Sequence, residues 1–495
     1  MARVGHSSRL MALGLVMVAS VVTVGLLLFL LPLQSLLILI LSVVVLVASV
    51  FFLHKEIGLL DIRRITIPGF FFFTFLAMIY LPSLFVFAEQ TGQYRFTYLS
   101  AVLSVMLTVP LGILLANRVL RFHKTEIKRF IALPLEEAPR SSARMAVPLC
   151  VLLSLALAVT VIYFREVGTV PSLYLILNIG DYKEAAWLRQ ESFLLLGSSI
   201  SYVYYVLRSF IYPTLITASF GYALLKRSAG WRLFFIVSFV FGIFYAGASL
   251  EKAPVAAIFL MLFLYYYFYR GGRVSAIHIG GGIVAVFLFP VLVLWGSWTS
   301  VGVDLGGVLR LIGERLFYVP AWGLYYYFEL FPDVIPFLHG RTIGKLSAVL
   351  GLDYFNTATY VFQYVAPRGL SSGYANAAFI GNMYADFGMW GVVVSGVLVG
   401  VLMQWAQVYL VRQKKSVLVL AVYTFLVFST WHLNNVPLPV VLLSNGAVLA
   451  IVLLWSMQLL DRILSRAEPR EWMATRRSSW NPQRARRLAR RRGNV

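Results

Sequence analysis

The amino-acid sequence predicts an all-α protein that crosses a membrane many times. Of its 495 residues, 60% are hydrophobic and only 13% are charged, and the mean hydropathy is +0.82. Apolar runs of about 17 to 25 residues recur along the chain, and each is long enough to cross the roughly 30 Å of hydrocarbon in a bilayer. Because a helix satisfies its own backbone hydrogen bonds in lipid, these runs are expected to be helical.

About twelve transmembrane helices are predicted from the positions of these runs. The first run follows a short basic segment. It is too long for the core of a signal peptide and has no small-x-small cleavage site, so we expect it to be retained. The runs belong to a polytopic transmembrane domain, residues 1–464, which is followed by a basic tail, residues 465–495. The predicted spans lie near residues 10–31, 33–53, 66–88, 96–116, 146–164, 199–225, 232–249, 254–269, 279–298, 389–411, 416–434 and 439–460.

The distribution of lysine and arginine predicts the orientation. With these spans, every basic connection falls on one side of the membrane, and the positive-inside rule assigns that side and both termini to the cytoplasm. The net charge of +22 lies mostly beside membrane helices, so anionic lipid headgroups are expected partners and nucleic acid is not. The basic connections contain Lys55, Arg63 and Arg64, the segment Arg118–Arg144, Lys226 and Arg227, Arg270 and Arg273, and Arg412, Lys414 and Lys415.

Two connections on the opposite, external side are too long to be simple turns, one at about residues 165–198 and one at about 299–388. The second mixes apolar, aromatic and charged residues without low complexity, so we expect it to be ordered. Part of it shows helical spacing of apolar residues with charged residues on the remaining face, which predicts a helix at the membrane interface. The apolar residues are Leu309, Ile312, Leu316 and Phe317, and the charged ones are Arg310, Glu314 and Arg315.

Cations on the external side or within spans are candidates for function, because membrane insertion disfavours them there. Arg208 lies inside a predicted span, where a charge costs on the order of 3 kcal/mol. It either reaches an anionic group in an internal cavity, or snorkels or pairs with Glu191 or Glu251. Lys252 either belongs to a solvated turn or lies at the mouth of the same cavity. The full set is Arg95, Arg165, Lys183, Arg189, Arg208, Lys252, Arg310, Arg315, Arg341, Lys345 and Arg368.

The long external connection also contains a candidate base. His339 lies beside Arg341 in a glycine-flanked turn, and an imidazole can accept a proton from a sugar hydroxyl. A purely structural role for this histidine remains open. His432 is a weaker second candidate, and the carboxylate alternatives are Glu251, Glu314 and Asp386.

Several further sequence patterns have both a functional and a structural interpretation, or a structural interpretation alone. No His/Cys cluster with metal-ligand spacing is present, so no metal or cofactor is expected. Glu329 and Asp333 are interpreted as a surface acidic pair, and Gly396-Val-Leu-Val-Gly400 as a helix-packing motif. Aromatic residues of the long connection either stack on sugar rings or form an interfacial belt; they include Tyr318, Trp322, Tyr325, Tyr326, Tyr327, Tyr354, Tyr360 and Tyr364.

Four stretches of this chain resemble the Wzy-type polymerases of O-antigen or oligosaccharide repeat units, and with the topology the resemblance covers residues 190–411. They are the Arg208-bearing span that ends at Pro213, Gly247-Ala-Ser-Leu-Glu-Lys-Ala-Pro254, Arg315-Leu-Phe-Tyr-Val-Pro320 and Phe379-Ile-Gly-Asn-Met-Tyr-Ala-Asp-Phe-Gly-Met-Trp-Gly391. The resemblance implies a GT-C-like membrane glycosyltransferase, akin to O-antigen ligases. Such enzymes act on the periplasmic side of the bacterial inner membrane on undecaprenyl-diphosphate-linked sugars.

The resemblance also implies roles for particular residues. Arginines bind phosphate oxygens as planar forks and stabilise a departing diphosphate without a metal. By this analogy the diphosphate is bound by Arg208, Lys252, Arg315 and Arg341, and Arg310 is the next candidate for this role. The assignment of His339 as the base comes from the residues alone. We expect a cavity that opens sideways to the bilayer for polyprenyl chains, and a polysaccharide chain-length regulator as a further partner.

Three other functions remain open at this stage: an O-antigen ligase, a flippase, and a structural scaffold for an envelope assembly machine. An O-antigen ligase would have nearly the same donor site. A flippase for lipid-linked oligosaccharides is expected to have two similar halves and short loops, so the long external connection argues against it.

Overall fold

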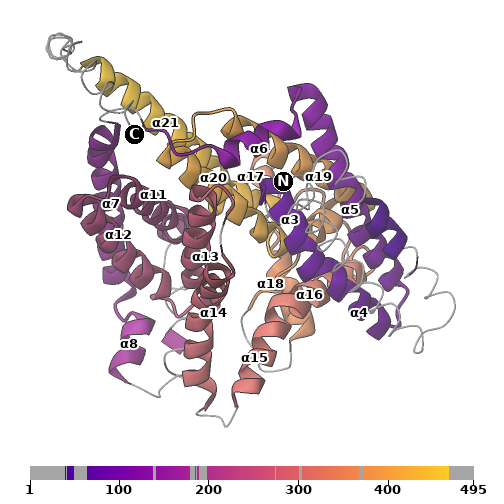
Figure 1. Cartoon of the computed structure of the whole chain (residues 1–495). Coiled ribbons are helices and arrows are strands. Elements are labelled where there is room, and N and C mark those ends of the chain that lie inside the picture. Colours follow the sequence, from indigo (N-terminus) through magenta and orange to yellow (C-terminus); the bar gives the residue numbers. More distant parts are fainter. Residues whose placement is uncertain are drawn as a thin grey trace, which may run out of the picture.

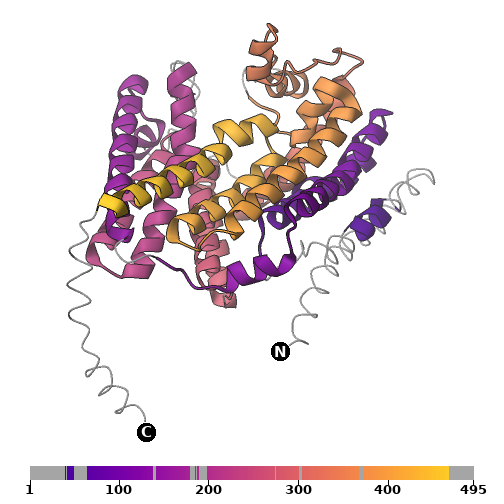
Figure 2. The ribbon, with the colours of Figure 1, turned by 90° about the horizontal axis from the view of Figure 1, so that it is seen from above.

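The computed structural model describes residues 40, 42–49, 64–137, 141–178, 184, 187–188, 198–273, 275–299, 304–366 and 373–467, and every regular element in these residues is a helix (Figures 1 and 2). The all-α prediction is therefore confirmed for the described part of the chain. The predicted span at 10–31, most of the span at 33–53, Lys183, Arg189, Arg368 and nearly all of the basic tail lie outside it.

Eight described helices are long and apolar enough to cross a membrane, and each coincides with a predicted span. The prediction at 279–298 falls on a helix with a shorter apolar segment, and the one at 199–225 falls on a continuous helix that contains Arg208. The eight are α3–η1–α4 (Ile67–Glu89), α5 (Tyr94–Leu120), α7 (Ser141–Val167), α12 (Ala229–Gly247), α13 (Lys252–Tyr269), α19 (Phe379–Val411), α20–η4 (Val417–Asn434) and the helical segment Val440–Ser465, which includes η5 (Val440–Ser444) and most of α21 (Ala447–Ala467).

The long external connection is folded, as predicted, wherever the structure describes it. It begins with a continuous helix, α15 (Leu305–Gly313), η3 (Glu314–Tyr318) and α16 (Val319–Leu330), which contains the predicted interface helix. Two short helices follow before α19. The remaining helices of the chain are α6 (Lys124–Ala132), α8 (Pro171–Leu177), α10 (Ser198–Val206), η2 (Leu207–Ile211), α11 (Tyr212–Lys226), α14 (Ala276–Thr299), α17 (Gly344–Val349) and α18 (Thr357–Val365).

Helices α5 and α19 lie side by side with their backbones in close contact (Figure 2). A Cβ atom added at Gly400 would overlap the carbonyl oxygen of Val109, and one added at Gly112 would overlap that of Val397. At Gly396 the same addition would overlap the hydroxyl of Thr108. Small residues that allow such an approach are typical of helix pairs in membranes. The packing interpretation of the Gly396–Gly400 motif is thus confirmed.

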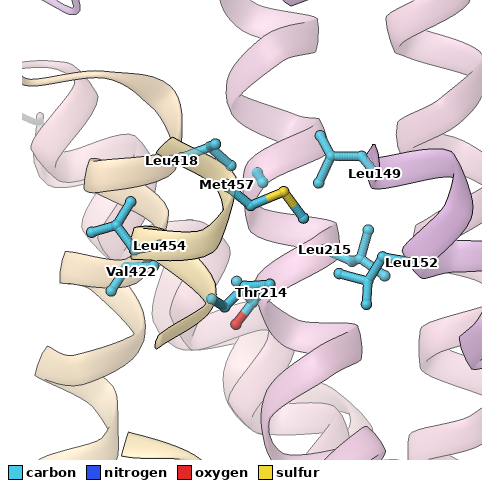
Figure 3. Close-up of a pocket in the computed structure, with 10 residues that line it drawn as sticks. Leu149, Leu152, Thr214, Leu215, Leu418, Val422, Leu454 and Met457 are labelled. Atoms are coloured by element: carbon cyan, nitrogen blue, oxygen red, sulfur yellow. The ribbon is translucent and has the colours of Figure 1, made fainter. Parts of the chain in front are cut away.

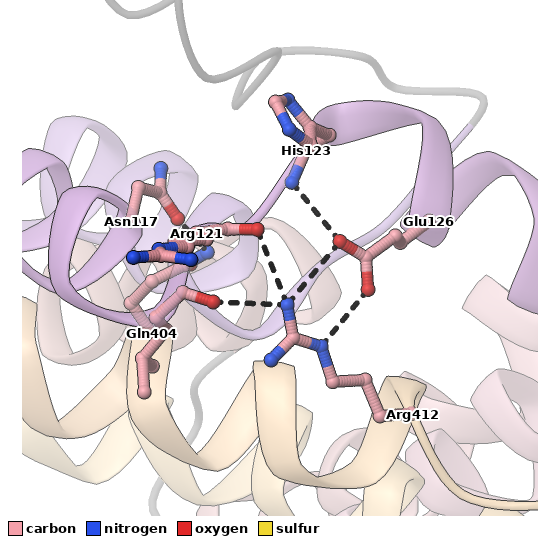
Figure 4. A network of polar contacts seen from close by, with 7 residues as sticks. Asn117, Arg121, His123, Glu126, Gln404 and Arg412 are labelled. Carbon is pink, nitrogen blue, oxygen red and sulfur yellow. Dashed lines mark hydrogen bonds and ion pairs between the residues drawn. The ribbon is translucent and has the colours of Figure 1, made fainter.

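Polar contacts join the described basic connections at one end of the bundle, which we call the basic end. Arg412, at the end of α19, donates from Nε to Oε2 of Glu126 in α6 at 3.0 Å (Figure 4). The other carboxylate oxygen of Glu126 accepts from the backbone N–H of His123 at 3.1 Å and so caps α6. Near the C-terminal end of α21, Asp461 accepts from Nε of Arg144 in α7 at 2.7 Å. Segments far apart in sequence are thereby fixed to one another.

A buried lysine links three elements at the basic end. The Lys415 side chain is 4% exposed, and its ammonium donates to the carbonyl oxygens of Ile131, Leu133 and Phe268 at 2.8, 2.8 and 3.1 Å. These three bonds use all the donors of the ammonium and satisfy carbonyls at the ends of α6 and α13. Burial lowers the pKa of Lys415 to about 8.

Replacing Lys415 by methionine is expected to lower the free energy of unfolding by about 3 kcal/mol, because three buried carbonyls lose their donor. Between pH 8 and about 10.4, the unfolded chain binds more protons at Lys415 than the folded protein. The stability of the wild type relative to Lys415→Met should therefore increase with pH in that window. Thermal unfolding in detergent measures both effects. Lys414→Met is the control, because that neighbouring side chain is 79% exposed; equal melting temperatures for the two variants would contradict the prediction.

Candidate functional site

Arg208 and Arg315 occupy the same kind of local structure. Each lies in a π-helical turn, η2 or η3, inside an otherwise α-helical segment. Such turns often occur at functional sites in proteins. In both cases a proline, Pro213 or Pro320, stands five residues after the arginine, and the local sequence is Arg-x-Phe-x-x-Pro. Proline lacks an N–H and its ring clashes with the preceding helical carbonyl, which disturbs α-helical hydrogen bonding in the turn before it.

The Arg208 side chain is 8% exposed and forms an ion pair with Glu251. Its Nη1 donates to the hydroxyl of Ser249 at 3.3 Å, and its Nε has no hydrogen-bond partner among the residues that the structure describes. The guanidinium carbon lies 5.1 and 5.0 Å from the ring centres of Tyr204 and Tyr205, within the range of cation–π attraction. The sequence left two pairings open for Arg208. The structure shows the one with Glu251, and Glu191 lies outside the described residues.

The turn that holds Glu251 begins helix α13. Glu251 is the N-cap residue and Lys252 is the first helical residue, so Lys252 is brought next to the Arg208 ion pair. The turn precedes α13 at the end opposite to Phe268, whose carbonyl contacts Lys415 at the basic end. Arg208, Glu251 and Lys252 therefore lie at the end of the bundle away from the basic connections, as the topology predicted.

His432 lies within electrostatic range of Arg208. It belongs to η4 at the end of α20. The ring packs against Phe428 with 5.3 Å between ring centres. From the sequence it is the weaker of two candidate bases, because interfacial hydrogen bonding explains a histidine at the end of a span.

The second cationic group lies on the helix that opens the long connection. Arg310 is exposed, and its Nε donates to Glu314 at 2.8 Å, four residues along the helix. Arg315 is exposed and makes no ion pair or hydrogen bond with the described residues. Glu314, a carboxylate alternative for the base, is therefore engaged with Arg310.

The third group is the turn that contains His339 and Arg341. Asp386 of α19 is fully buried and binds this turn through hydrogen bonds. Its carboxylate accepts from the backbone N–H groups of Gly340 and Thr342 at 2.9 and 3.3 Å, and from the Thr342 hydroxyl. His339 has a left-handed backbone with φ 50° and an exposed side chain. Asp386, one of the carboxylate alternatives for the base, holds this turn in place. The Asp-Phe-Gly sequence around it gave no indication of that role.

Arg341 is connected to the next segment of the chain. Its Nε donates to the carbonyl oxygen of Asp353 at 3.0 Å, and its guanidinium carbon lies 5.9 Å from the ring centre of Phe355. The neighbouring Tyr354 is 58% exposed. Tyr374, which is 67% exposed, interacts electrostatically with both Tyr354 and Tyr205. Tyr374 is thus within electrostatic range of a tyrosine from the Arg208 group and of a tyrosine beside Arg341. No described contact joins Arg315 to either group.

Two apolar hollows lie between the helices. The first, lined by residues such as Leu149, Thr214, Leu418 and Met457, measures about 10 Å³ and has no room for a substrate (Figure 3). The second is a groove of about 230 Å³ between α7 and the α10–η2–α11 helix. Its lining includes Leu207, the residue directly before Arg208. The groove can accept an aliphatic chain beside the buried arginine, but it has no charged lining residue.

The fold defines the class of this molecule, an all-helical, multi-pass membrane protein. No family model matches the chain, and neither a curated protein nor a solved structure is similar enough to match it. Among the described residues, no group of three or more His, Cys, Asp and Glu side chains could hold a metal ion. The function is therefore inferred from the cationic groups and their surroundings.

Proposed function

We propose that this protein is a membrane glycosyltransferase that polymerises undecaprenyl-diphosphate-linked oligosaccharide repeat units on the external face of the bacterial inner membrane. The observation that carries the proposal is Arg208. A buried arginine at the end of the bundle away from the basic connections, next to Lys252 and an apolar groove, suits a ligand with an anionic head and a long hydrocarbon chain.

In the proposed reaction, the acceptor hydroxyl oxygen bonds to the anomeric carbon of the donor sugar. The bond from that carbon to the diphosphate oxygen breaks, and the hydroxyl proton passes to a base. The lipid diphosphate leaves with additional negative charge. The cations that stabilise this charge are Arg208, Lys252, Arg315 and Arg341, and Arg310 is the next candidate. When the diphosphate binds, it replaces Glu251 as the partner of Arg208. A GT-C-like arrangement and a chain-length regulator as partner belong to the same proposal.

The purified protein, incubated with undecaprenyl-diphosphate-linked repeat units and EDTA, is expected to yield a ladder of glycan lengths on a gel. Transfer to added lipid A–core without a ladder would make the protein a ligase. Movement of lipid-linked oligosaccharide across liposomes without any transfer would make it a flippase.

The same assay tests the base. His339→Ala is expected to lose turnover while it still binds the lipid-linked donor, because only proton transfer is affected. His432→Ala is the matched comparison, since that ring lies nearer to Arg208. If His339→Ala keeps turnover and His432→Ala loses it, His432 is the base that accepts the hydroxyl proton.

A further inference from the structure

Helix α16 exposes a single narrow face, and that face is aromatic and acidic. Val319 is 39% exposed, and Trp322, Tyr326 and Glu329 follow it at helical spacing and are partly exposed. All other residues of α16 are buried, including Tyr325 and Tyr327 at 1% exposure each. The structure therefore divides the tyrosines of the long connection into those of the core and those available to a ligand.

The exposed rings form one continuous surface with α18. The ring centres of Trp322 and Tyr326 are 4.8 Å apart, and those of Tyr326 and Tyr364 are 6.3 Å apart. Tyr364, which is 49% exposed, donates its hydroxyl to Oε1 of Glu329 at 3.0 Å. We call Trp322, Tyr326, Glu329 and Tyr364 the aromatic patch.

A second carboxylate borders this patch. Tyr94, at the start of α5, donates to Oδ2 of Asp333 at 2.7 Å, and its hydroxyl interacts electrostatically with Glu329. Glu329 is thus surrounded by tyrosine hydroxyls, and the pair that the sequence suggested, Glu329 and Asp333, forms part of a larger surface. This surface lies beside the α4–α5 turn, at the end of α5 away from the basic end.

The chemistry of the patch selects one class of ligand. Flat rings with an apolar face and a polar edge suit a molecule that has both C–H faces and hydroxyl groups. Partly exposed carboxylates accept hydrogen bonds from several hydroxyls at once. A purely lipid-facing belt would gain nothing from two carboxylates between the rings. Seven residues separate Trp322 from Glu329, roughly 10 Å of helix, which spans more than one sugar ring.

We propose that the aromatic patch is a saccharide-binding site that holds the uncharged sugars of the glycan while the arginines hold the diphosphate. This proposal rests on the proposed function, because it identifies the part of the same substrate that the cationic groups do not recognise. Trp322, Tyr326 and Tyr364 stack on the sugars, and Glu329 accepts hydroxyl hydrogen bonds and orients the Tyr364 ring.

The test measures binding, separately from turnover. The probe is the oligosaccharide pool released by mild acid from the lipid-linked fraction of the source cells, and saturation-transfer NMR on the full chain in detergent reports its contact. Trp322→Leu is expected to weaken binding about tenfold, and Tyr364→Phe, which keeps its ring, about threefold. Trp455→Leu, which removes a tryptophan 59% exposed on α21, should bind as the wild type does.

If Trp322→Leu fails to fold, Tyr364→Leu at the more exposed α18 position replaces it in the same assay. Wild-type affinity in the folded variants would overturn the saccharide site. Weaker quenching of tryptophan fluorescence by brominated lipid chains in Trp322→Leu than in the wild type would also overturn it and leave an interfacial belt. The two proposals fail in different ways. If the patch variants bind saccharide as the wild type does and still form the ladder, only the saccharide-site proposal is rejected. If the wild type binds saccharide but forms no ladder, only the polymerase proposal is rejected.

Discussion

Arg315→Ala is expected to abolish polymer formation, with a loss of at least roughly a hundredfold in turnover, while the protein still inserts and melts at the wild-type temperature. Removing one donor to a developing negative charge costs about that much in other enzymes. Arg315 is exposed and has no partner among the described residues, so its removal should change the free energy of unfolding by less than about 0.5 kcal/mol. The ladder assay and thermal unfolding measure the two effects.

Arg165→Ala is the matched control for this experiment. Arg165 lies in the last turn of α7, at the same end of the bundle, and is also exposed, but it belongs to none of the cationic groups. Arg315→Lys should recover only part of the activity, because lysine supplies a charge without the planar fork. Wild-type polymer lengths in Arg315→Ala would remove this arginine from the proposed site.

Arg208→Met is expected to lose both activity and stability. The substitution removes a charge from the proposed diphosphate site, and it also takes the Arg208 guanidinium away from the Glu251 carboxylate, which is 23% exposed. Breaking a buried ion pair at one partner costs about 3 to 5 kcal/mol, and the partial exposure of Glu251 places the expected loss at the lower end. Polymer length and melting temperature should therefore fall together.

The double variant Arg208→Met with Glu251→Gln separates the two effects. With both charges absent, no carboxylate remains that has lost the Arg208 guanidinium, so most of the melting temperature should return. Under the proposed function, activity should stay lost, because the diphosphate would still have no arginine at η2. Recovery of activity with stability in the double variant would show that Arg208 serves only to neutralise Glu251.

Much of the architecture could be predicted from the sequence, because hydropathy and length are properties of a short stretch of chain. The eight membrane-length helices are predicted in this way, and helical spacing predicts the part of the continuous helix at residues 305–330 that lies around residues 309–317. The assembly of basic connections at one end was predicted as well, since a charge bias needs no knowledge of packing. Which side faces the cytoplasm stays a prediction.

The candidate site was harder to predict from the sequence, because its contacts join residues that are far apart in the chain. Glu251 could be named as one of two partners for Arg208, but only the fold brings it there. The positions of His432 and Asp386 depend on the packing of η4 and α19. The sequence does contain one local signal, because the repeated Arg-x-Phe-x-x-Pro marks the two π-helical turns that hold an arginine, η2 and η3. The other two described π-helical turns, η1 and η5, lack it.

The close backbone contact between α5 and α19 has a mechanical consequence. Glycines on both helices leave no clearance for sliding, and Asp386 attaches the turn of His339 and Arg341 to the same α19. That turn is therefore fixed relative to α5 and α19. Under the proposed function, each repeat unit would be joined at one stationary level, and the finished polymer would be displaced outward by the length of one unit per cycle.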